Sequence, residues 1–116
     1  MKILHHSGLT KSYWFAKNIF EQMANIGAEV GRAINWRKKD AKTANFAFER
    51  ALELFDLTTA DPKNKNRLKE ICRLREAFVD FFLYDNIYHT TEKFWHNYFY
   101  SFNYAARVGL VKLLHC

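Results

Sequence analysis

The stretch KFWHNYFYSFNYAARVGL, residues 93–110, decides the fold. Its apolar and small residues recur every three or four positions, at Trp95, Tyr98, Phe99, Phe102, Ala105, Ala106 and Gly109. Because an α-helix turns once in 3.6 residues, these positions share one face, and such a face packs against a core. Eleven of the chain's twenty Phe, Tyr and Trp residues lie between Phe81 and Tyr104. We therefore expect a long C-terminal helix whose aromatic face lies at the centre of the protein.

Three earlier segments show the same helical period. Residues 12–38, 41–58 and 62–83 each carry apolar side chains three or four positions apart, and short polar connections separate them. Short connections between helices make neighbouring helices antiparallel. The chain therefore predicts an all-α fold, a single four-helix bundle of up-down-up-down topology. It forms one domain over residues 1–116, with residues 1–10 as a loose N-terminal arm.

Capping signals mark two of the helix boundaries. Asp61 is a good N-cap residue, and Pro62 sits at the first helical position, where its missing N–H costs nothing. Thr90 or Thr91 is expected to cap the last helix, and Glu92 in the first turn complements the helix dipole.

Two glycines lie inside the first predicted helix, Gly27 and Gly31. Each costs about 1 kcal/mol relative to alanine in a helix interior. A close neighbour usually accounts for such a residue, so we expect tight packing within the chain. The alternative is a face for self-association.

Composition and charge narrow the classes of partner. The chain has 116 residues, a net charge of +6 and a pI of about 9.4, which favours nucleic acid or an acidic protein surface. Its two cysteines form no disulfide framework, and Cys72 is expected to be a buried free thiol. No apolar run approaches the ~20 residues of a membrane span, and no signal peptide is evident. We expect a cytoplasmic protein without a membrane partner.

The predicted topology gathers cationic residues at one end. Antiparallel helices bring together residues from distant parts of the sequence, with Asp61 as the only clear opposing charge. We expect this end to bind nucleic acid because converging cations contact phosphates. The alternative is a merely solvated surface. The candidate nucleic-acid-binding residues are Lys11, Lys17, Lys63, Lys65, Arg67, Arg107 and Lys112.

Arg75 stands out because it falls within the apolar stripe of the third predicted helix, between Ile71 and Phe78. A buried guanidinium requires a carboxylate partner. Counting turns from the connection near Asp61 places Glu49 at the same level, so we predict a buried Arg75–Glu49 ion pair. This pair would fix the register of the helices. Alternatively, Arg75 would bind an anion in a partly open groove.

Signals for enzymatic chemistry are weak. A metal site in a helical bundle uses inward glutamates and Glu-x-x-His pairs on two helices, whereas this chain offers one Glu92–His96 pair at a spacing of four. We find no glycine-rich phosphate loop and no Ser, Cys, His and Asp constellation. We therefore expect no catalytic residues, no metal site and no cofactor, and thus a protein that is not an enzyme.

Three segments resemble a family of small uncharacterised helical proteins from bacteria and archaea. They are SYWFAKNIFEQMANIGAEVGRAINW, AFERALELFDLTTADPKNKNRLKEICRLREAFVDFF and FNYAAR, which span residues 12–107. This resemblance implies no known activity. The order ALEL, short loop, RLKEICRLREAF is similar, at the level of pattern, to a wider four-helix-bundle group. That group includes proteins encoded in 23S ribosomal RNA intervening sequences and accessory proteins of diversity-generating retroelements. It implies a basic, often oligomeric bundle that works with nucleic acid, although this chain lacks the Ser-Asn-Ile-Ala-Glu-Gly motif of the intervening-sequence proteins.

Two functional hypotheses follow. The first is a non-enzymatic accessory protein that binds RNA or DNA through the basic end. The second is a structural or protein–protein interaction module with no nucleic-acid role. Trp14 and Trp36 lie off the main stripe of their helix, which suits either packing against helix ends or, if they are exposed, an interface. We therefore also expect a protein partner or a homo-oligomer.

Overall fold

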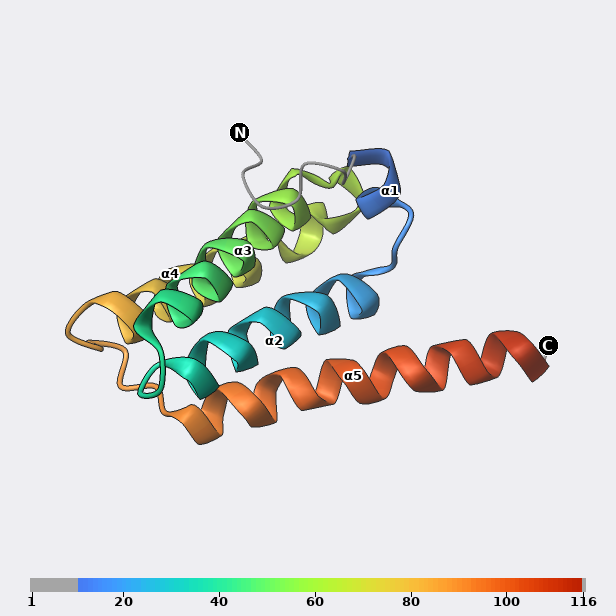
Figure 1. Cartoon of the computed structure of the whole chain (residues 1–116). Coiled ribbons are helices and arrows are strands. Elements are labelled where there is room, and N and C mark those ends of the chain that lie inside the picture. The colour runs from blue at the N-terminus through green and yellow to red at the C-terminus, as the bar shows by residue number, and fades with distance from the viewer. Residues whose placement is uncertain (1–10, 116) are drawn as a thin grey trace.

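The computed structural model describes the backbone of residues 11–115 and the side chains of residues 11–107 (Figure 1). The expected N-terminal arm, residues 1–10, lies outside the described residues. The described chain is helical and contains no strand, so the predicted all-α class is confirmed. Its elements are α1 Lys11–Phe15, α2 Ile19–Trp36, α3 Ala41–Ala60, the 3-10 helix η1 Pro62–Arg67, α4 Leu68–Leu83 and α5 Glu92–His115.

The first predicted helix is broken at Asn18, which corrects the expected single helix over residues 12–38. The Asn18 side-chain oxygen accepts the Glu21 N–H at 2.9 Å, and the Glu21 carboxylate accepts the Asn18 N–H at 3.4 Å. This reciprocal capping box starts α2 afresh. Trp14 of α1 is buried, and its Nε1 donates to Thr58 Oγ1 at 3.1 Å. Trp14 is therefore part of the core, which agrees with packing against helix ends and not with an exposed interface residue.

The third predicted helix is also divided. Asp61 caps it as predicted, accepting the Lys63 N–H at 3.1 Å, with Pro62 at the first position. The first six residues nevertheless form the 3-10 helix η1, and α4 begins only at Leu68. The start of α5 agrees with the prediction, because Thr91 Oγ1 accepts the Phe94 N–H at 3.0 Å.

Helix α2 lies in the middle of the arrangement. It packs against α3 and against α5, and α4 packs against α3 (Figure 1). Helix α5 runs alongside α2 in the opposite direction (Figure 1). Helices α4 and α5 are in contact through the rings of Phe78 and Trp95, whose centroids lie 5.4 Å apart. Each of the four long helices therefore contributes to one core.

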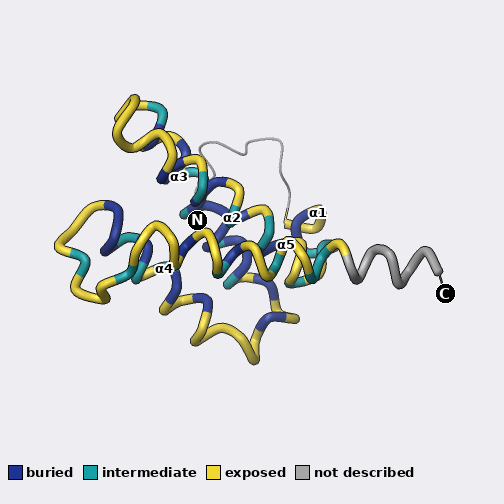
Figure 2. The backbone as a smooth tube through the Cα atoms, turned by 90° about the horizontal axis from the view of Figure 1, so that it is seen from below, coloured by how far each residue is buried: buried dark blue, intermediate teal, exposed yellow. Residues whose placement is uncertain are grey.

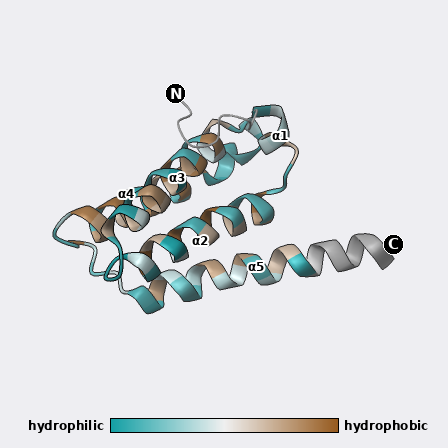
Figure 3. Cartoon of the chain, in the orientation of Figure 1, coloured by the Kyte–Doolittle hydropathy of each residue, from teal (hydrophilic) through white to brown (hydrophobic). Residues whose placement is uncertain are grey.

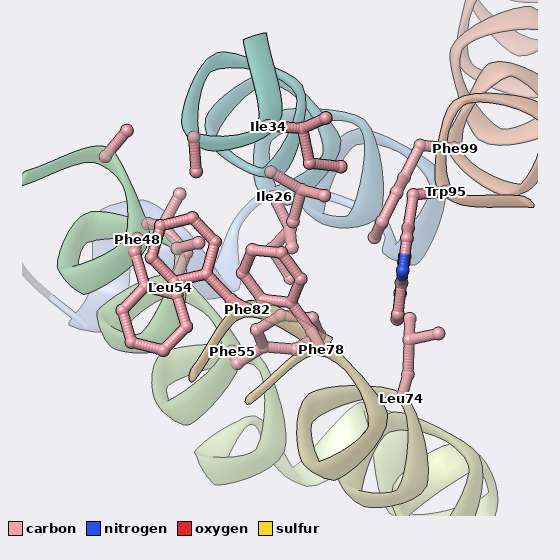
Figure 4. Packing of buried hydrophobic residues seen from close by; sticks show 14 of the residues in the cluster. Ile26, Ile34, Phe48, Leu54, Phe55, Leu74, Phe78, Phe82, Trp95 and Phe99 are labelled. Atoms are coloured by element: carbon pink, nitrogen blue, oxygen red, sulfur yellow. The ribbon is translucent and has the colours of Figure 1, made fainter. Parts of the chain in front are cut away.

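The core is rich in aromatic rings (Figure 4). Phe48 of α3 stacks on Phe82 of α4 with centroids 4.5 Å apart. Trp95 and Phe99 bring α5 into the same cluster (Figure 4). Along each long helix, buried positions alternate with exposed ones, as the helical period predicts (Figure 2).

The aromatic stripe of α5 is only partly central. Trp95 and Phe99 are buried, whereas Tyr98 and Phe102 are half-buried, so the expectation that Phe102 is a central core residue is wrong. Phe102 meets the partly exposed Phe20 near the start of α2, with ring centroids 6.5 Å apart. Its ring therefore covers the edge of the core rather than filling its centre.

The two glycines of α2 differ in their surroundings. A Cβ at Gly27 would lie 2.6 Å from Phe99 Cβ, so the predicted tight packing within the chain is confirmed at this residue. A Cβ at Gly31 would have nothing within 4 Å. Glycine therefore allows the close approach of α5 at Gly27 and leaves a gap at Gly31.

Candidate nucleic-acid interface

A network of buried polar side chains holds α1, α2, α3 and η1 together at one end of the molecule. Gln22 Nε2 donates to the Trp14 carbonyl at 3.0 Å and to Asp61 Oδ2 at 2.8 Å. Asn64 Nδ2 donates to Gln22 Oε1 at 2.8 Å and to the Thr58 carbonyl at 3.0 Å. Buried polar groups are stable only when they are hydrogen-bonded, so this network fixes η1 in one position against α1 and α2.

Asp61 and Lys63 neutralise each other inside this network. Asp61 is buried, and its carboxylate accepts hydrogen bonds from Gln22 and from Lys63 Nζ. Burial alone would raise the pKa of Asp61, but these hydrogen bonds together hold the pKa below its usual value. Lys63 Nζ also donates to the Phe15 carbonyl at 2.7 Å. Lys63 is therefore bound into the structure, whereas we expected a free phosphate contact.

The other cationic residues of this end are available to a ligand. Within the described chain, Lys11, Lys65, Arg67 and Arg107 are exposed and form no ion pair with a carboxylate. Lys17 is half-buried, with Nζ 4.9 Å from the centroid of the Tyr13 ring. The side chain of the last candidate, Lys112, lies outside the described residues.

The structure places these residues at the same end of the molecule, on α1 and the segment that follows it, on η1 and on α5. The contact of Lys63 with the Phe15 carbonyl places η1, with Lys65 and Arg67, beside α1. The ring contact between Phe20 and Phe102 places the later part of α5 beside the start of α2. Arg107 lies little more than one turn beyond Phe102 and so belongs to the same end. We call Lys11, Lys17, Lys65, Arg67 and Arg107 the basic end.

We expected Asp61 to be the only clear opposing carboxylate at this end, but two glutamates lie here as well. Glu21 is exposed in the first turn of α2 and caps that helix. Glu70 accepts a hydrogen bond from the Tyr98 hydroxyl at 3.0 Å, and burial together with this carboxylate raises the pKa of Tyr98. Tyr98 therefore remains a neutral donor to Glu70. Both glutamates are engaged within the fold, and the basic end keeps an excess of positive charge.

The predicted buried pair of Arg75 and Glu49 is wrong. Arg75 Nε lies 3.0 Å from Asp56 Oδ1, and the two side chains are 35% and 40% exposed. Because η1 belongs to the connection and not to the packed length of α4, Arg75 lies level with Asp56. Asp56 is seven residues after Glu49, about two helical turns along α3. The pair lies at the surface and lines a groove between α3 and α4.

The opposite end of the molecule has a different character. Arg37 Nη2 donates to the carbonyls of Phe81 and Phe82, at 3.1 and 3.2 Å, and its guanidinium lies over both rings. Asp40 caps α3 through the backbone N–H groups of the residues that follow. Lys38 and Lys39 are exposed beside these groups. This end mixes charges and provides a matched control for the basic end.

Helix α5 contributes a surface that we did not predict. No Asp or Glu follows Glu92 in the sequence, and Tyr100 and Tyr104 are 69% and 63% exposed. In Figure 3, α5 is coloured as less hydrophobic than α3 and α4. The signal was present in the sequence, since a helix that has no acidic residue after its first position and exposes tyrosines suits a polyanion.

The described residues contain no group of three or more His, Cys, Asp or Glu side chains that could hold a metal ion.

Cys72 is exposed at the surface of α4, so the expected burial of this thiol is wrong. Among the described residues, no helix has the length and apolar character needed to span a membrane.

Comparison with known proteins gives no family assignment. No family model, no curated protein and no solved structure matches this chain.

Proposed function

We propose that this chain is a non-enzymatic accessory protein that binds nucleic acid through the basic end. In this proposal the four long helices act as one up-down-up-down bundle that presents α1, η1 and α5 on a common surface. The observation that carries the proposal is the burial of Asp61. Its charge is neutralised inside the fold by Lys63, whereas Lys65 and Arg67 on the same 3-10 helix are exposed and unpaired within the described chain.

The expected contacts are with phosphate groups. Lysine binds a phosphate as a point charge, and the guanidinium of arginine binds it through two parallel hydrogen bonds. The buried network of Gln22 and Asn64 fixes η1, so Lys65 and Arg67 extend from a rigid element. Such contacts favour binding without strong sequence preference. The resemblance to intervening-sequence and retroelement accessory proteins stays a prediction that points the same way.

Charge reversal tests this proposal. We would measure the fluorescence anisotropy of labelled RNA and DNA about 16 nucleotides long, at ~50 mM salt, where electrostatic binding is strong. The variant Lys65→Glu/Arg67→Glu should lose most of its affinity. The matched control Lys38→Glu/Lys39→Glu changes the same number of charges at the opposite end and should bind nearly as well as the wild type. Lys63 stays unchanged because it stabilises the fold.

Salt dependence gives a second readout. The log–log slope of affinity against salt should become less steep by roughly 0.7–0.9 for each phosphate contact that is lost. Equal losses in the two variants would mean that net charge alone drives binding, and the basic end would not be the site. If the wild type binds neither RNA nor DNA at this salt concentration, the proposal is wrong.

A second candidate function is a protein–protein interaction module, and one observation favours it. Leu83, Tyr84, Ile87 and Tyr88 are all more than half exposed around the connection between α4 and α5. Contiguous apolar and aromatic surface of this kind marks interfaces. The occupant we would test is a second copy of the chain. Sedimentation of the wild type and of Tyr84→Ser/Ile87→Ser should then show a dimer that only the wild type forms.

A further inference from the structure

A small hollow lies between α2 and α5, beside the exposed tyrosines. Its volume is about 270 Å³, and Gly31, Trp95, His96, Tyr100 and Asn103 are among the residues that line it. Pockets for drug-sized ligands begin at about 300 Å³. A hollow of this size therefore suits one flat ring rather than a larger molecule.

The hollow exists because residue 31 is a glycine. A Cβ at this position would meet nothing within 4 Å, unlike one at Gly27, which would collide with Phe99. Close packing therefore explains Gly27 but not Gly31. A glycine inside a helix costs roughly 0.5–1 kcal/mol relative to alanine. Since nothing packs against Gly31, the space itself is the feature that this residue provides.

The side chains around the hollow can stack on the face of a flat ring and form hydrogen bonds with its edge. The side chains of His96 and Asn103 form no hydrogen bond within the described chain, so their side-chain donors and acceptors are available. Tyr100 is 69% exposed, and its ring makes no contact with another aromatic ring of the described chain. The buried Trp95 and Phe99 supply an apolar back wall. Nucleobases are flat, stack on tyrosine and carry donors and acceptors on their edges.

Beyond the hollow, the same face of α5 leads to Arg107 of the basic end. Asn103 and Arg107 are four residues apart on α5, so they share one face about 6 Å apart along the helix axis. Tyr104 lies between them in the sequence and is exposed. No acidic residue follows Glu92, so nothing in the sequence of this helix beyond its first residue repels a phosphate backbone.

We propose that this hollow binds one unpaired base of a single-stranded nucleic acid, whose backbone continues past Arg107 to the basic end. The inference rests on the proposed function and names its substrate class. Bases in a duplex are stacked and paired, so they cannot enter the hollow, whereas the bases of a single strand are free to do so.

Filling the hollow tests the proposal. In Gly31→Leu the new side chain occupies the space, and the fold should tolerate it because its Cβ meets nothing within 4 Å and the hollow lies open beside it. We expect affinity for a single strand to fall roughly 5- to 150-fold, as for the loss of one stacked base, with affinity for a duplex unchanged. Ala28→Leu adds the same side chain at an exposed position of α2 outside the hollow, and it should bind like the wild type.

Two further variants probe the lining without filling the space. Asn103→Ala and Tyr100→Ala should weaken single-strand binding in the same way, and Tyr100→Phe should retain most of it because stacking needs only the ring. Titration with adenosine monophosphate, followed by NMR, should shift the signals of the Gly31 amide and the Asn103 side-chain amide. Gly31→Leu should abolish these shifts at residue 103.

The outcomes separate this inference from the proposed function. If Lys65→Glu/Arg67→Glu loses binding but the Gly31 and Asn103 variants bind as the wild type, the base pocket is refuted and the basic end stands. If no polymer binds but adenosine monophosphate shifts both amides, the proposed function and the single-strand inference are both refuted, and the hollow is a site for free mononucleotides only. If neither the polymer nor the mononucleotide binds, both are wrong.

Discussion

Replacement of each α2 glycine by alanine is the most direct test of how α5 packs. The two sites lie four residues apart on one face of the same helix, so helix propensity is the same for both. Alanine should stabilise a helix interior by roughly 0.5–1 kcal/mol relative to glycine. At Gly31 the space is open, so Gly31→Ala should be stabilising by about this amount.

Gly27→Ala should behave in the opposite way. The new Cβ would lie 2.6–2.8 Å from Phe99 Cβ, Cγ and Cδ1. Phe99 Cβ lies next to the backbone and cannot swing aside, so α5 itself must shift. Overpacking of this kind costs about 1–3 kcal/mol, which opposes the gain in helix propensity. The two variants should therefore differ in unfolding free energy by about 1–3 kcal/mol.

Urea and thermal denaturation of both variants beside the wild type would measure this difference. A difference of 1 kcal/mol corresponds to about 4 °C in Tm for a protein of this size. The double variant Gly27→Ala/Phe99→Ala should show a coupling energy above about 0.5 kcal/mol, because the two residues touch. If Gly27→Ala raises stability as much as Gly31→Ala does, α5 does not approach α2 through Phe99, and the close contact between Gly27 and Phe99 is refuted.

Two further predictions concern charged residues. Arg75→Ala should lower stability by under about 1 kcal/mol in urea denaturation, because its pair with Asp56 is more than a third exposed; a loss of several kcal/mol would show that the pair is buried. The carboxyl of Asp61 has a folded-state pKa below its usual 3.8, so its stabilising contribution is fully present above pH 3.8 and is lost as the pH falls through the lower folded-state value. The stability gap between the wild type and Asp61→Asn should therefore shrink only below about pH 4, and a gap that already closes near neutral pH would contradict this assignment.

The sequence by itself determined the helical class and several helix boundaries. The helical period of apolar residues and the capping groups Asp61 and Thr91 act over a few residues, so they can be recognised without knowing the fold. The break at Asn18 was equally local, since Asn18 and Glu21 form a capping box that sequence inspection could have detected. The cluster of cations at one end also follows from helix order and antiparallel connections.

Only the tertiary structure decided which residues meet across helices. The partner of Arg75 depends on how many residues the connection uses, and η1 moved that partner from Glu49 to Asp56. The roles of Gly27 and Gly31 differ because one faces Phe99 and the other faces empty space, although both belong to the same helical face. Such differences arise because packing depends on distances between separate elements to within about an ångström, whereas the sequence pattern specifies only which face of each helix is apolar.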